Sequence, residues 1–285
     1  MDGIICINKP KGITSFDVVR KLKKILKEKR IGHTGTLDPL ATGVMIICIG
    51  RATKMVQDLE GKDKDYIAGF ELGYKTDTYD LEGTVVASKE FDSIPLETLN
   101  EVLELFKGDI KQVPPMYSAL KVDGKRLYDL AREGITVERK ERDVKITSLY
   151  LQDFNGRSGN LFCSVSKGTY IRSLVYDIGE TLGVYATLTD LMRTRVGDTP
   201  ISKCYTLEEV ETLCENSNFD FISSVEKYFN YPKLEILNDE QLKYYKNGNS
   251  FSYIKDNGYY SIYYNDEFIG LGNVTRNRLQ AYKYF

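Results

Sequence analysis

A stretch rich in glycine and proline, residues 32–43, constrains the fold of this chain more than any other segment. It reads Gly-His-Thr-Gly-Thr-Leu-Asp-Pro-Leu-Ala-Thr-Gly and is followed at once by the apolar run Val44–Ile49. Glycine and proline favour sharp turns and let a backbone approach a ligand closely, and the apolar run is typical of a buried strand. The sequence predicts a stiff loop anchored on a core strand, which is well suited to presenting a catalytic side chain.

Two titratable residues of this loop are the first candidates for chemistry. They are Asp38 and His33, and His33 is the only histidine of the chain. Pro39 fixes its own φ and pushes Asp38 toward an extended conformation, so the carboxylate sits on rigid backbone. Asp-Pro is also a common turn and helix-start dipeptide, and a lone loop histidine often only makes hydrogen bonds. The residue types alone leave both roles open.

Length and composition bound the class of protein. A chain of 285 residues has room for one large domain or two. Its 42% hydrophobic and 28% charged residues are ordinary for a globular protein. No apolar run approaches the roughly 20 residues that span a bilayer, and the N-terminus lacks the pattern of a secretory signal. We therefore expect a cytoplasmic protein without a membrane segment.

Five scattered cysteines and one histidine give no metal-binding pattern. No two cysteines form a C-x-x-C pair, so zinc is not favoured and no metal site is expected. None of the cysteines has a recognisable base partner for catalysis. We expect them to serve as small buried hydrophobic residues: they are Cys6, Cys48, Cys163, Cys204 and Cys214.

The distribution of charge matters more than its sum. The net charge of −2 argues against nucleic acid as a partner. However, residues 1–62 carry 12 lysines and arginines against 6 acidic residues, and many of these basic residues lie within 20–30. Such a basic segment permits a local phosphate-binding face, although it could equally be a solvated helix surface.

Apolar periodicity divides the rest of the chain into strands and helices. Strands are predicted at 3–10, 64–73, 144–154 and 160–166. Helices are predicted at 14–30, 51–59, 95–106, 126–132 and 206–214. A further helix is expected to begin in the block 167–172, to run to about Leu182 and to stop at Gly183. The segment 216–218 is polar enough to begin a linker. From about residue 231, tyrosines and glycines punctuate short alternating runs, which predicts a small β-rich module.

Five blocks of this sequence resemble the TruB family of tRNA pseudouridine synthases. The loop 32–43 is similar to the active-site motif of that family position for position. The others are Asn8-Lys9-Pro10-Lys11-Gly12-Ile13-Thr14-Ser15, Lys64-Asp65-Tyr66, Lys167-Gly168-Thr169-Tyr170-Ile171-Arg172 and Leu191-Met192-Arg193. Two further segments also resemble parts of the family: 76–83, which is expected to form a loop, and the extended segment 113–121. The family often has aspartate where this chain has Asn8, which leaves the role of Lys9 open. The resemblance covers about residues 3–200 well and the tail only weakly.

The resemblance implies a fold and a domain organisation. The expected fold class is α+β, a pseudouridine-synthase-like catalytic domain with a mixed, mostly antiparallel sheet and a small C-terminal β-rich, PUA-like domain. The catalytic domain is expected at 1–228, with 108–140 as an insertion that closes over RNA. The PUA-like RNA-binding domain is expected at 229–285.

The resemblance also assigns site residues. Asp38 is expected to be the essential carboxylate and Arg172 its ion-pair partner. Tyr66 is expected to lie against the target uracil and to assist in removing a proton. The substrate-binding residues would be His33, Tyr66, Tyr170, Leu191 and Lys9. From the residue types alone, Tyr66 and Leu191 fit a hydrophobic core equally well, and Arg172 fits an ordinary surface position.

The reaction that the resemblance implies is isomerisation of uridine 55 in the T-loop of tRNA. The uridine must leave its stack before a side chain can reach it. Asp38 would act either as nucleophile or as the base that removes a ribose proton to give a glycal. The resemblance implies no cofactor, guide RNA or required protein partner; the expected partner is the T-stem-loop of tRNA.

The sequence leaves two other functions open. One is a catalytically idle protein on the same scaffold that binds or folds tRNA. The other is a hydrolase that uses Asp38 on a small glycoside, but the second well-placed carboxylate of such enzymes is missing from the sequence pattern.

Overall fold

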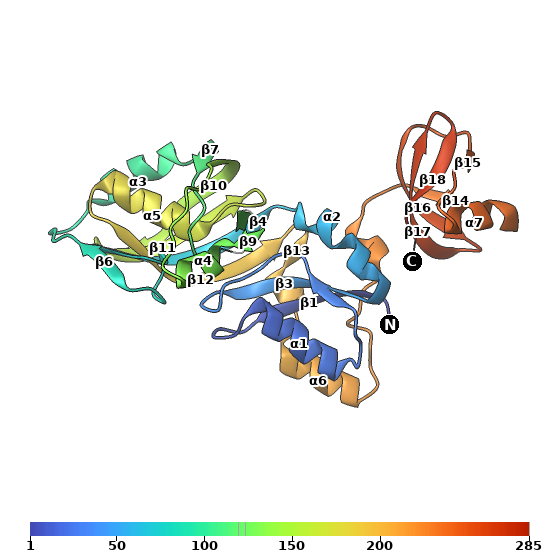
Figure 1. The fold of residues 1–285 in the computed structure, drawn as a ribbon, viewed down its shortest axis with the longest axis horizontal. Coiled ribbons are helices and arrows are strands. Elements are labelled where there is room, and N and C mark those ends of the chain that lie inside the picture. The colour runs from blue at the N-terminus through green and yellow to red at the C-terminus, as the bar shows by residue number, and fades with distance from the viewer. Residues whose placement is uncertain (119, 123, 285) are drawn as a thin grey trace.

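The computed structural model describes residues 1–118, 120–122 and 124–284 of the chain. Figure 1 shows a large unit that holds most of these residues and a smaller C-terminal module joined to it by a linker. None of the helices in the described residues combines the length and the apolar character that crossing a membrane requires.

A nine-stranded sheet forms the centre of the large unit within these residues. Its strands follow the order β1 (Gly3–Lys9), β3 (Thr42–Ile49), β12 (Ala186–Val196), β4 (Lys64–Leu72), β11 (Ser158–Val165), β10 (Arg142–Phe154) and β7 (Gly108–Gln112), with β2 (Ile31–His33) beside β3 and β13 (Thr199–Pro200) beside β12. Every neighbouring pair is antiparallel except β3 and β12, which run parallel. This is a mixed, mostly antiparallel sheet, so the predicted α+β class is confirmed.

Helices cover the two halves of this sheet separately. Helices α1 (Ser15–Ile25) and α6 (Leu207–Glu215) pack on the half that contains β1 and β3. Helices α3 (Leu96–Leu105) and α5 (Ile171–Leu182) pack on the half that contains β4, β10 and β11 (Figure 1). The short elements are η1 (Gly50–Met55), α2 (Val56–Glu60), the hairpin β5 (Tyr74–Thr76) and β6 (Val85–Ser88), β8 (Lys121–Val122), β9 (Lys125–Arg126), α4 (Leu127–Arg132), η2 (Ile201–Lys203) and η3 (Val225–Tyr228).

Side-chain caps set several helix ends where the sequence predicts them. Thr14 caps α1 in a reciprocal capping box with Asp17, and Thr206 does the same for α6 with Glu209. Gly183 ends α5 in the left-handed conformation, with a φ of 71°. These local signals need no tertiary information, which is why the sequence alone locates them.

The predicted extension of the first helix to Arg30 is wrong. Helix α1 ends at Ile25, and Lys27 adopts a positive φ of 52°. The turn lets Ile31 pair with Ile49 at the edge of β3, and the Arg30 carbonyl accepts a hydrogen bond from the Gly50 amide. Strand pairing here overrides the helix propensity of the basic residues.

The C-terminal module is built on a five-stranded sheet, as the prediction of a small β-rich unit requires. Its strands follow the order β14 (Lys233–Glu235), β16 (Gly258–Tyr264), β17 (Glu267–Thr275), β18 (Arg278–Tyr284) and β15 (Phe251–Ser252). It also contains a helix that was not predicted, α7 (Asp239–Lys246), which Asn238 caps by accepting a hydrogen bond from the Gln241 amide.

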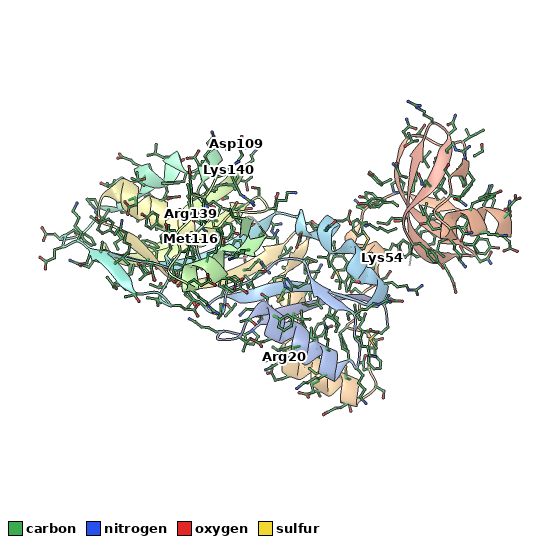
Figure 2. All side chains as sticks on the ribbon, in the orientation of Figure 1. Arg20, Lys54, Asp109, Met116, Arg139 and Lys140 are labelled. Carbon is green, nitrogen blue, oxygen red and sulfur yellow. The ribbon has the colours of Figure 1, made fainter. Side chains whose placement is uncertain are left out.

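The module makes polar contacts with the large unit. Lys54 donates a hydrogen bond of 2.7 Å to the Tyr284 carbonyl, and Figure 2 shows Lys54 on the part of the large unit nearest to the module. The Tyr282 hydroxyl bonds the Asp58 carboxylate. Leu271 of the module is fully buried in an apolar cluster with Ile4 and Met55, so the contact has an apolar component as well.

The parallel meeting of β3 and β12 depends on Gly43. It has a φ of 104°, and a Cβ atom at this position would lie 2.2 Å from the Arg193 carbonyl oxygen. Only glycine lets the two strands approach this closely. The two halves of the sheet, and the loop before β3, are held together at this point.

We expect Gly43→Ala to destabilise the protein by more than about 2 kcal/mol, because it combines backbone strain with a backbone clash. Gly12→Ala is a matched control: Gly12 has a φ of 84°, but a Cβ there would meet nothing within 4 Å. Urea unfolding of the two variants measures the difference. Equal losses of stability would show that the close approach at Gly43 has no energetic importance.

Candidate active site

A cavity of about 540 Å³ opens where the two halves of the large sheet meet. Most of its lining comes from five segments: the loop between β2 and β3, strand β4, the start of β10, the segment leading into α5, and strand β12. Glu60 and Ser118 complete the lining. It brings together five of the predicted site residues: Asp38, Tyr66, Tyr170, Arg172 and Leu191. In the described residues, no group of three or more histidine, cysteine, aspartate or glutamate side chains is arranged to hold a metal ion.

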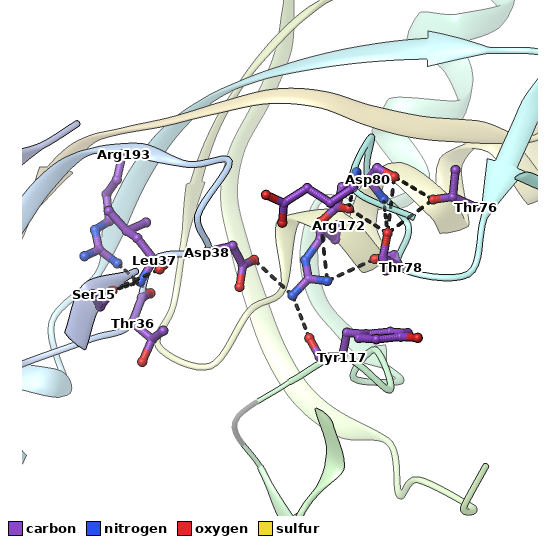
Figure 3. A network of polar contacts seen from close by, with 11 residues as sticks. Ser15, Thr36, Leu37, Asp38, Thr76, Thr78, Asp80, Tyr117, Arg172 and Arg193 are labelled. Atoms are coloured by element: carbon purple, nitrogen blue, oxygen red, sulfur yellow. Dashed lines mark hydrogen bonds and ion pairs between the residues drawn. The ribbon is translucent and has the colours of Figure 1, made fainter. Parts of the chain in front are cut away.

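Asp38 and Arg172 form an ion pair at the centre of the cavity. The Arg172 Nη2 atom lies 2.9 Å from Asp38 Oδ2, and the two side chains point toward each other (Figure 3). The Asp38 side chain is 37% exposed and that of Arg172 only 6%. The Asp38 carboxylate therefore faces the cavity, and the more deeply buried Arg172 guanidinium pairs with it from the protein interior.

Arg172 is itself fixed by three further partners. It donates hydrogen bonds of 3.0 Å to the Thr78 carbonyl and 2.7 Å to the Tyr117 carbonyl. Its Nη1 atom lies 3.5 Å from the carboxylate of Asp80, which is 2% exposed. A guanidinium has five donors in a planar fork, and these contacts keep that fork in one orientation.

Asp80 is a site residue that the sequence reasoning missed as a partner of Arg172. It accepts hydrogen bonds from the Thr78 hydroxyl at 2.6 Å and the Glu82 amide at 3.0 Å. The intervening Tyr79 has a φ of 68°, which turns Thr78 and Asp80 toward the same guanidinium. The loop was recognised in the sequence, but nothing local indicates which of its carboxylates is buried.

The environment of Asp38 contains opposing influences on its ionisation. Desolvation by the cavity wall raises its pKa above the ordinary aspartate value, and the positive charge of Arg172 lowers it. The nearby Asp80 raises the pKa of Asp38 further, and Lys9 lowers it. Arg172 is therefore the chief group that favours the ionised carboxylate.

The loop that carries Asp38 is held by hydrogen bonds from the family-like block 8–15. The Ser15 hydroxyl donates to the Leu37 carbonyl at 2.9 Å and accepts from the Leu37 amide at 2.8 Å. The Gly12 amide donates to the Pro39 carbonyl at 2.8 Å. These bonds hold the backbone on both sides of Asp38.

Lys9 and His33 lie outside the lining of this cavity. Lys9 is fully buried under the loop and donates to the carbonyls of Pro10 at 2.9 Å and Pro39 at 3.4 Å. Burial lowers its pKa to about 8. His33 is partly exposed at the end of β2 and accepts a hydrogen bond of 3.4 Å from the Gly35 amide at Nδ1. Both are placed to support the loop.

Arg193 is a second residue that sequence reasoning did not assign. It is 2% exposed and donates to the carbonyls of Val44 at 2.7 Å and Gly35 at 3.2 Å. It also lines the cavity beside Tyr66. Its position two residues after Leu191 puts both side chains on one face of β12, and this spacing could have indicated it.

Tyr66 and Tyr170 line the cavity from different elements. Tyr66 lies on β4 and is 6% exposed; its burial raises the pKa of the phenol, and Arg193 opposes that shift. The backbone of Tyr170 is clamped by Gln112, which accepts from its amide at 2.7 Å and donates to its carbonyl at 3.0 Å.

Besides Arg172, four basic side chains line the cavity: Lys64, Arg142, Lys167 and Arg193. The same lining contains three carboxylates, those of Asp38, Glu60 and Asp143. Burial lowers the pKa of Lys64 to about 8. A cavity lined by apolar, aromatic and basic side chains is suited to a nucleotide with its flanking phosphates.

Comparison with protein families gives two matches that adjoin each other. Residues 23–171 match the model of the TruB family pseudouridylate synthase N-terminal domain, and residues 172–228 match that of the tRNA pseudouridylate synthase B C-terminal domain. The first match includes Asp38 and Tyr66, and the second begins at Arg172.

Two curated proteins show the similarity over their whole length. The chain is 54% identical to a protein from Fusobacterium nucleatum named tRNA pseudouridine synthase B, with 100% of both chains covered. It is 43% identical to a protein of the same name from Clostridium tetani, with 99% of both covered.

Solved structures share the fold. One is described as an H/ACA RNP bound to a substrate RNA containing 2′-deoxyuridine; it matches with a TM-score of 0.72 and 25% identity over 99% of this chain and 84% of that chain. Another, a Cbf5-Nop10-Gar1 complex, matches with a TM-score of 0.70 and 28% identity over 96% of this chain and 78% of that chain.

Proposed function

This chain belongs to the TruB family and forms pseudouridine in tRNA; from that premise we propose that its target is uridine 55 of the T-loop, flipped into the Asp38 cavity. The observation that supports the proposal most strongly is the Asp38–Arg172 ion pair at 2.9 Å, with the carboxylate facing a cavity of nucleotide size. A flipped base costs a few kcal/mol of lost stacking, and Tyr66 and Leu191 can offset part of that cost.

Asp38 is the essential carboxylate of the proposed reaction. The N1–C1′ bond of the uridine breaks, the uracil turns within the cavity, and a new bond joins C5 to C1′. Asp38 acts either as a nucleophile or as the base that removes a ribose proton to give a glycal. Either route requires the ionised carboxylate, which Arg172 favours through its charge and its hydrogen bond.

Tyr66 has two roles in the proposed reaction. Its ring supports the uracil by stacking, and its hydroxyl takes part in removal of the C5 proton, which completes the isomerisation. The Arg193 guanidinium lowers the pKa of the Tyr66 phenol against the effect of burial, so it assists proton transfer. Tyr170 and Leu191 position the nucleotide, and Lys9 and His33 support the loop beneath it.

The recognition of RNA is divided between the two units in this proposal. Residues 1–228 form the catalytic domain, in which 108–140 closes over the RNA, and 229–285 form a PUA-like domain that binds tRNA. The Tyr117 carbonyl bonds Arg172, and Ser118 lines the cavity, so this region adjoins the site. Residues 119 and 123 lie outside the described structure.

We further propose that the folded T-stem-loop is recognised without a guide RNA or a required protein partner, and that the protein acts in the cytoplasm, where its substrate is found. Incubation of the purified chain with an isolated T-stem-loop RNA tests this directly. Conversion supports the proposal. Binding of that RNA without conversion would favour an idle RNA-binding protein, and retention of simple nucleosides instead would favour a glycosidase.

We expect Tyr66→Phe to bind tRNA within about threefold of the wild-type affinity but to turn over at least about 100-fold more slowly. Phenylalanine keeps the ring that stacks on uracil and removes only the hydroxyl. Single-turnover kinetics and filter binding measure the two effects. Tyr150→Phe, on an exposed position of β10, is the control, and normal turnover by Tyr66→Phe would remove the hydroxyl from the chemistry.

A further inference from the structure

Two cysteines lie side by side on the face of the sheet away from α1. Ile7 of β1 and Tyr205 form a parallel bridge, because the Tyr205 amide donates to the Cys6 carbonyl and the Asn8 amide donates to the Tyr205 carbonyl, both at 2.9 Å. Cys6 and Cys204 each precede one of these partners, so they are neighbours in register. Cys204 has an extended backbone, with φ −96° and ψ 145°, and both side chains belong to the same apolar cluster.

This register has the spacing that a disulfide needs. Neighbouring strands lie about 4.8 Å apart, and disulfides form between Cα atoms about 4.4–6.8 Å apart. Side chains in register on parallel strands point to the same face. Cys6 of β1 and Cys204, in the extended segment after η2, can therefore be joined without moving the backbone.

The Cys6 sulfur is activated by its neighbours. A hydrogen bond from the Cys204 thiol lowers the pKa of Cys6, and bonds from the Tyr228 and Thr199 hydroxyls and the charge of Lys203 act in the same direction against burial. The Tyr228 hydroxyl lies 2.9 Å from the Cys6 sulfur. Donors and positive charge around a thiol increase its thiolate fraction and hence its reactivity.

A small cavity of about 260 Å³ is lined in part by Cys6, whose side chain is itself buried. Its floor contains Cys6 and the buried Thr199, and exposed residues such as Lys203 and Lys227 stand at its rim. The cavity is separate from the Asp38 cavity, with which it shares no lining residue. Its volume exceeds that of one water molecule many times, so it has room for hydrogen peroxide.

We propose that Cys6 and Cys204 form a dithiol site that hydroperoxides oxidise to a disulfide. The Cys6 thiolate attacks one oxygen of hydrogen peroxide, the O–O bond breaks, and Cys6 becomes a sulfenic acid while hydroxide leaves. The Cys204 thiol then attacks the Cys6 sulfur, forms the S–S bond and releases water. The peroxide is reduced to water, and the two thiols are oxidised to one disulfide.

The other cysteines lack this arrangement. Cys48 and Cys163 are fully buried, and burial raises the pKa of each thiol to about 12. Cys48 lies on β3 opposite Ile4, so it is close enough to Cys6 to be the competing partner that an experiment must exclude. Cys214 is partly exposed, like Cys204, which contradicts the prediction that all five cysteines are buried.

The test treats the reduced full-length protein with a small excess of hydrogen peroxide, removes the oxidant with catalase, blocks free thiols and maps the peptides by mass spectrometry. We expect a reducible link between Cys6 and Cys204, and loss of the Cys6 thiol at least about tenfold faster than loss of the Cys163 thiol. Cys204→Ser should give no link and should leave a Cys6 sulfenic acid that dimedone traps.

Two controls keep the outcome clear. Cys163→Ser and Cys48→Ser should form the Cys6–Cys204 link at the wild-type rate, and circular dichroism confirms that each variant is folded. A link from Cys6 to Cys48, or a Cys6 thiol that reacts no faster than that of Cys163, would overturn the proposal. The assay measures no RNA conversion, so its result does not depend on the proposed target uridine.

Discussion

Replacing Asp38 by asparagine should reduce pseudouridine formation by at least about 10³-fold while tRNA binding stays within a few fold of wild type. Asparagine has nearly the same size and keeps a hydrogen-bond acceptor for Arg172. It cannot act as a nucleophile or as a base, since it carries no negative charge. The loss should therefore appear in the single-turnover rate rather than in the dissociation constant.

An exposed ion pair outside the cavity provides the matched control for this prediction. Asp190 of β12 pairs with Lys11 at 2.7 Å, and both side chains are more than half exposed. Asp190→Asn should keep nearly wild-type turnover. If Asp38→Asn remains active with a native circular dichroism spectrum, Asp38 is not the essential carboxylate and the proposed chemistry is wrong.

Substitution of Arg172 should have the second largest effect. Arg172→Gln is expected to lower turnover by about 10²–10³-fold and to destabilise the protein by about 3–5 kcal/mol, because the buried Asp80 loses its charged partner. Arg172→Lys keeps the charge but loses the planar fork that reaches Asp38, Thr78 and Tyr117. It should recover part of the stability and little of the activity.

The pH profile separates the positioning role of Arg172 from a purely structural one. Asp38 must be ionised, so activity falls as the pH drops through its pKa. Arg172 lowers that pKa, and its removal should raise it. The acid limb of the single-turnover rate should therefore move to higher pH in Arg172→Gln. An unchanged acid limb would mean that Arg172 does not set the ionisation of Asp38.

Arg195→Gln is the control for this substitution. Arg195, on β12, makes a bidentate pair with Asp65, in which both hydrogen bonds measure 2.6 Å. It does not line the Asp38 cavity. The variant is expected to lose some stability while keeping both the turnover and the acid limb of the wild-type profile.

The sequence predicted those features that depend on local chemistry. Thr14, Thr206 and Gly183 mark helix ends through caps that act over three or four residues. The Gly-Pro loop predicted a rigid support for Asp38, and the fold class followed from the family resemblance. Asp38, Tyr66 and Arg172 each lie in a contiguous motif, so the sequence identifies them without information on their proximity.

Features that depend on distant partners were missed. The end of α1 is set by pairing of Ile31 with β3, which no helix signal reports. Asp80 matters because the fold buries it against Arg172, and Arg193 because β12 runs beside β3. The proximity of Cys6 and Cys204, nearly 200 residues apart in the sequence, likewise arises only from the bridge between Ile7 of β1 and Tyr205.

The most direct test of the central claim is nucleotide-resolved mapping of pseudouridine in an unmodified tRNA after incubation with the full-length protein. We predict one new pseudouridine, at position 55, and none in a transcript with cytidine at that position. Asp38→Asn should give none in either RNA. A pseudouridine at another position, or no conversion by protein that is folded and binds the tRNA, would contradict the account.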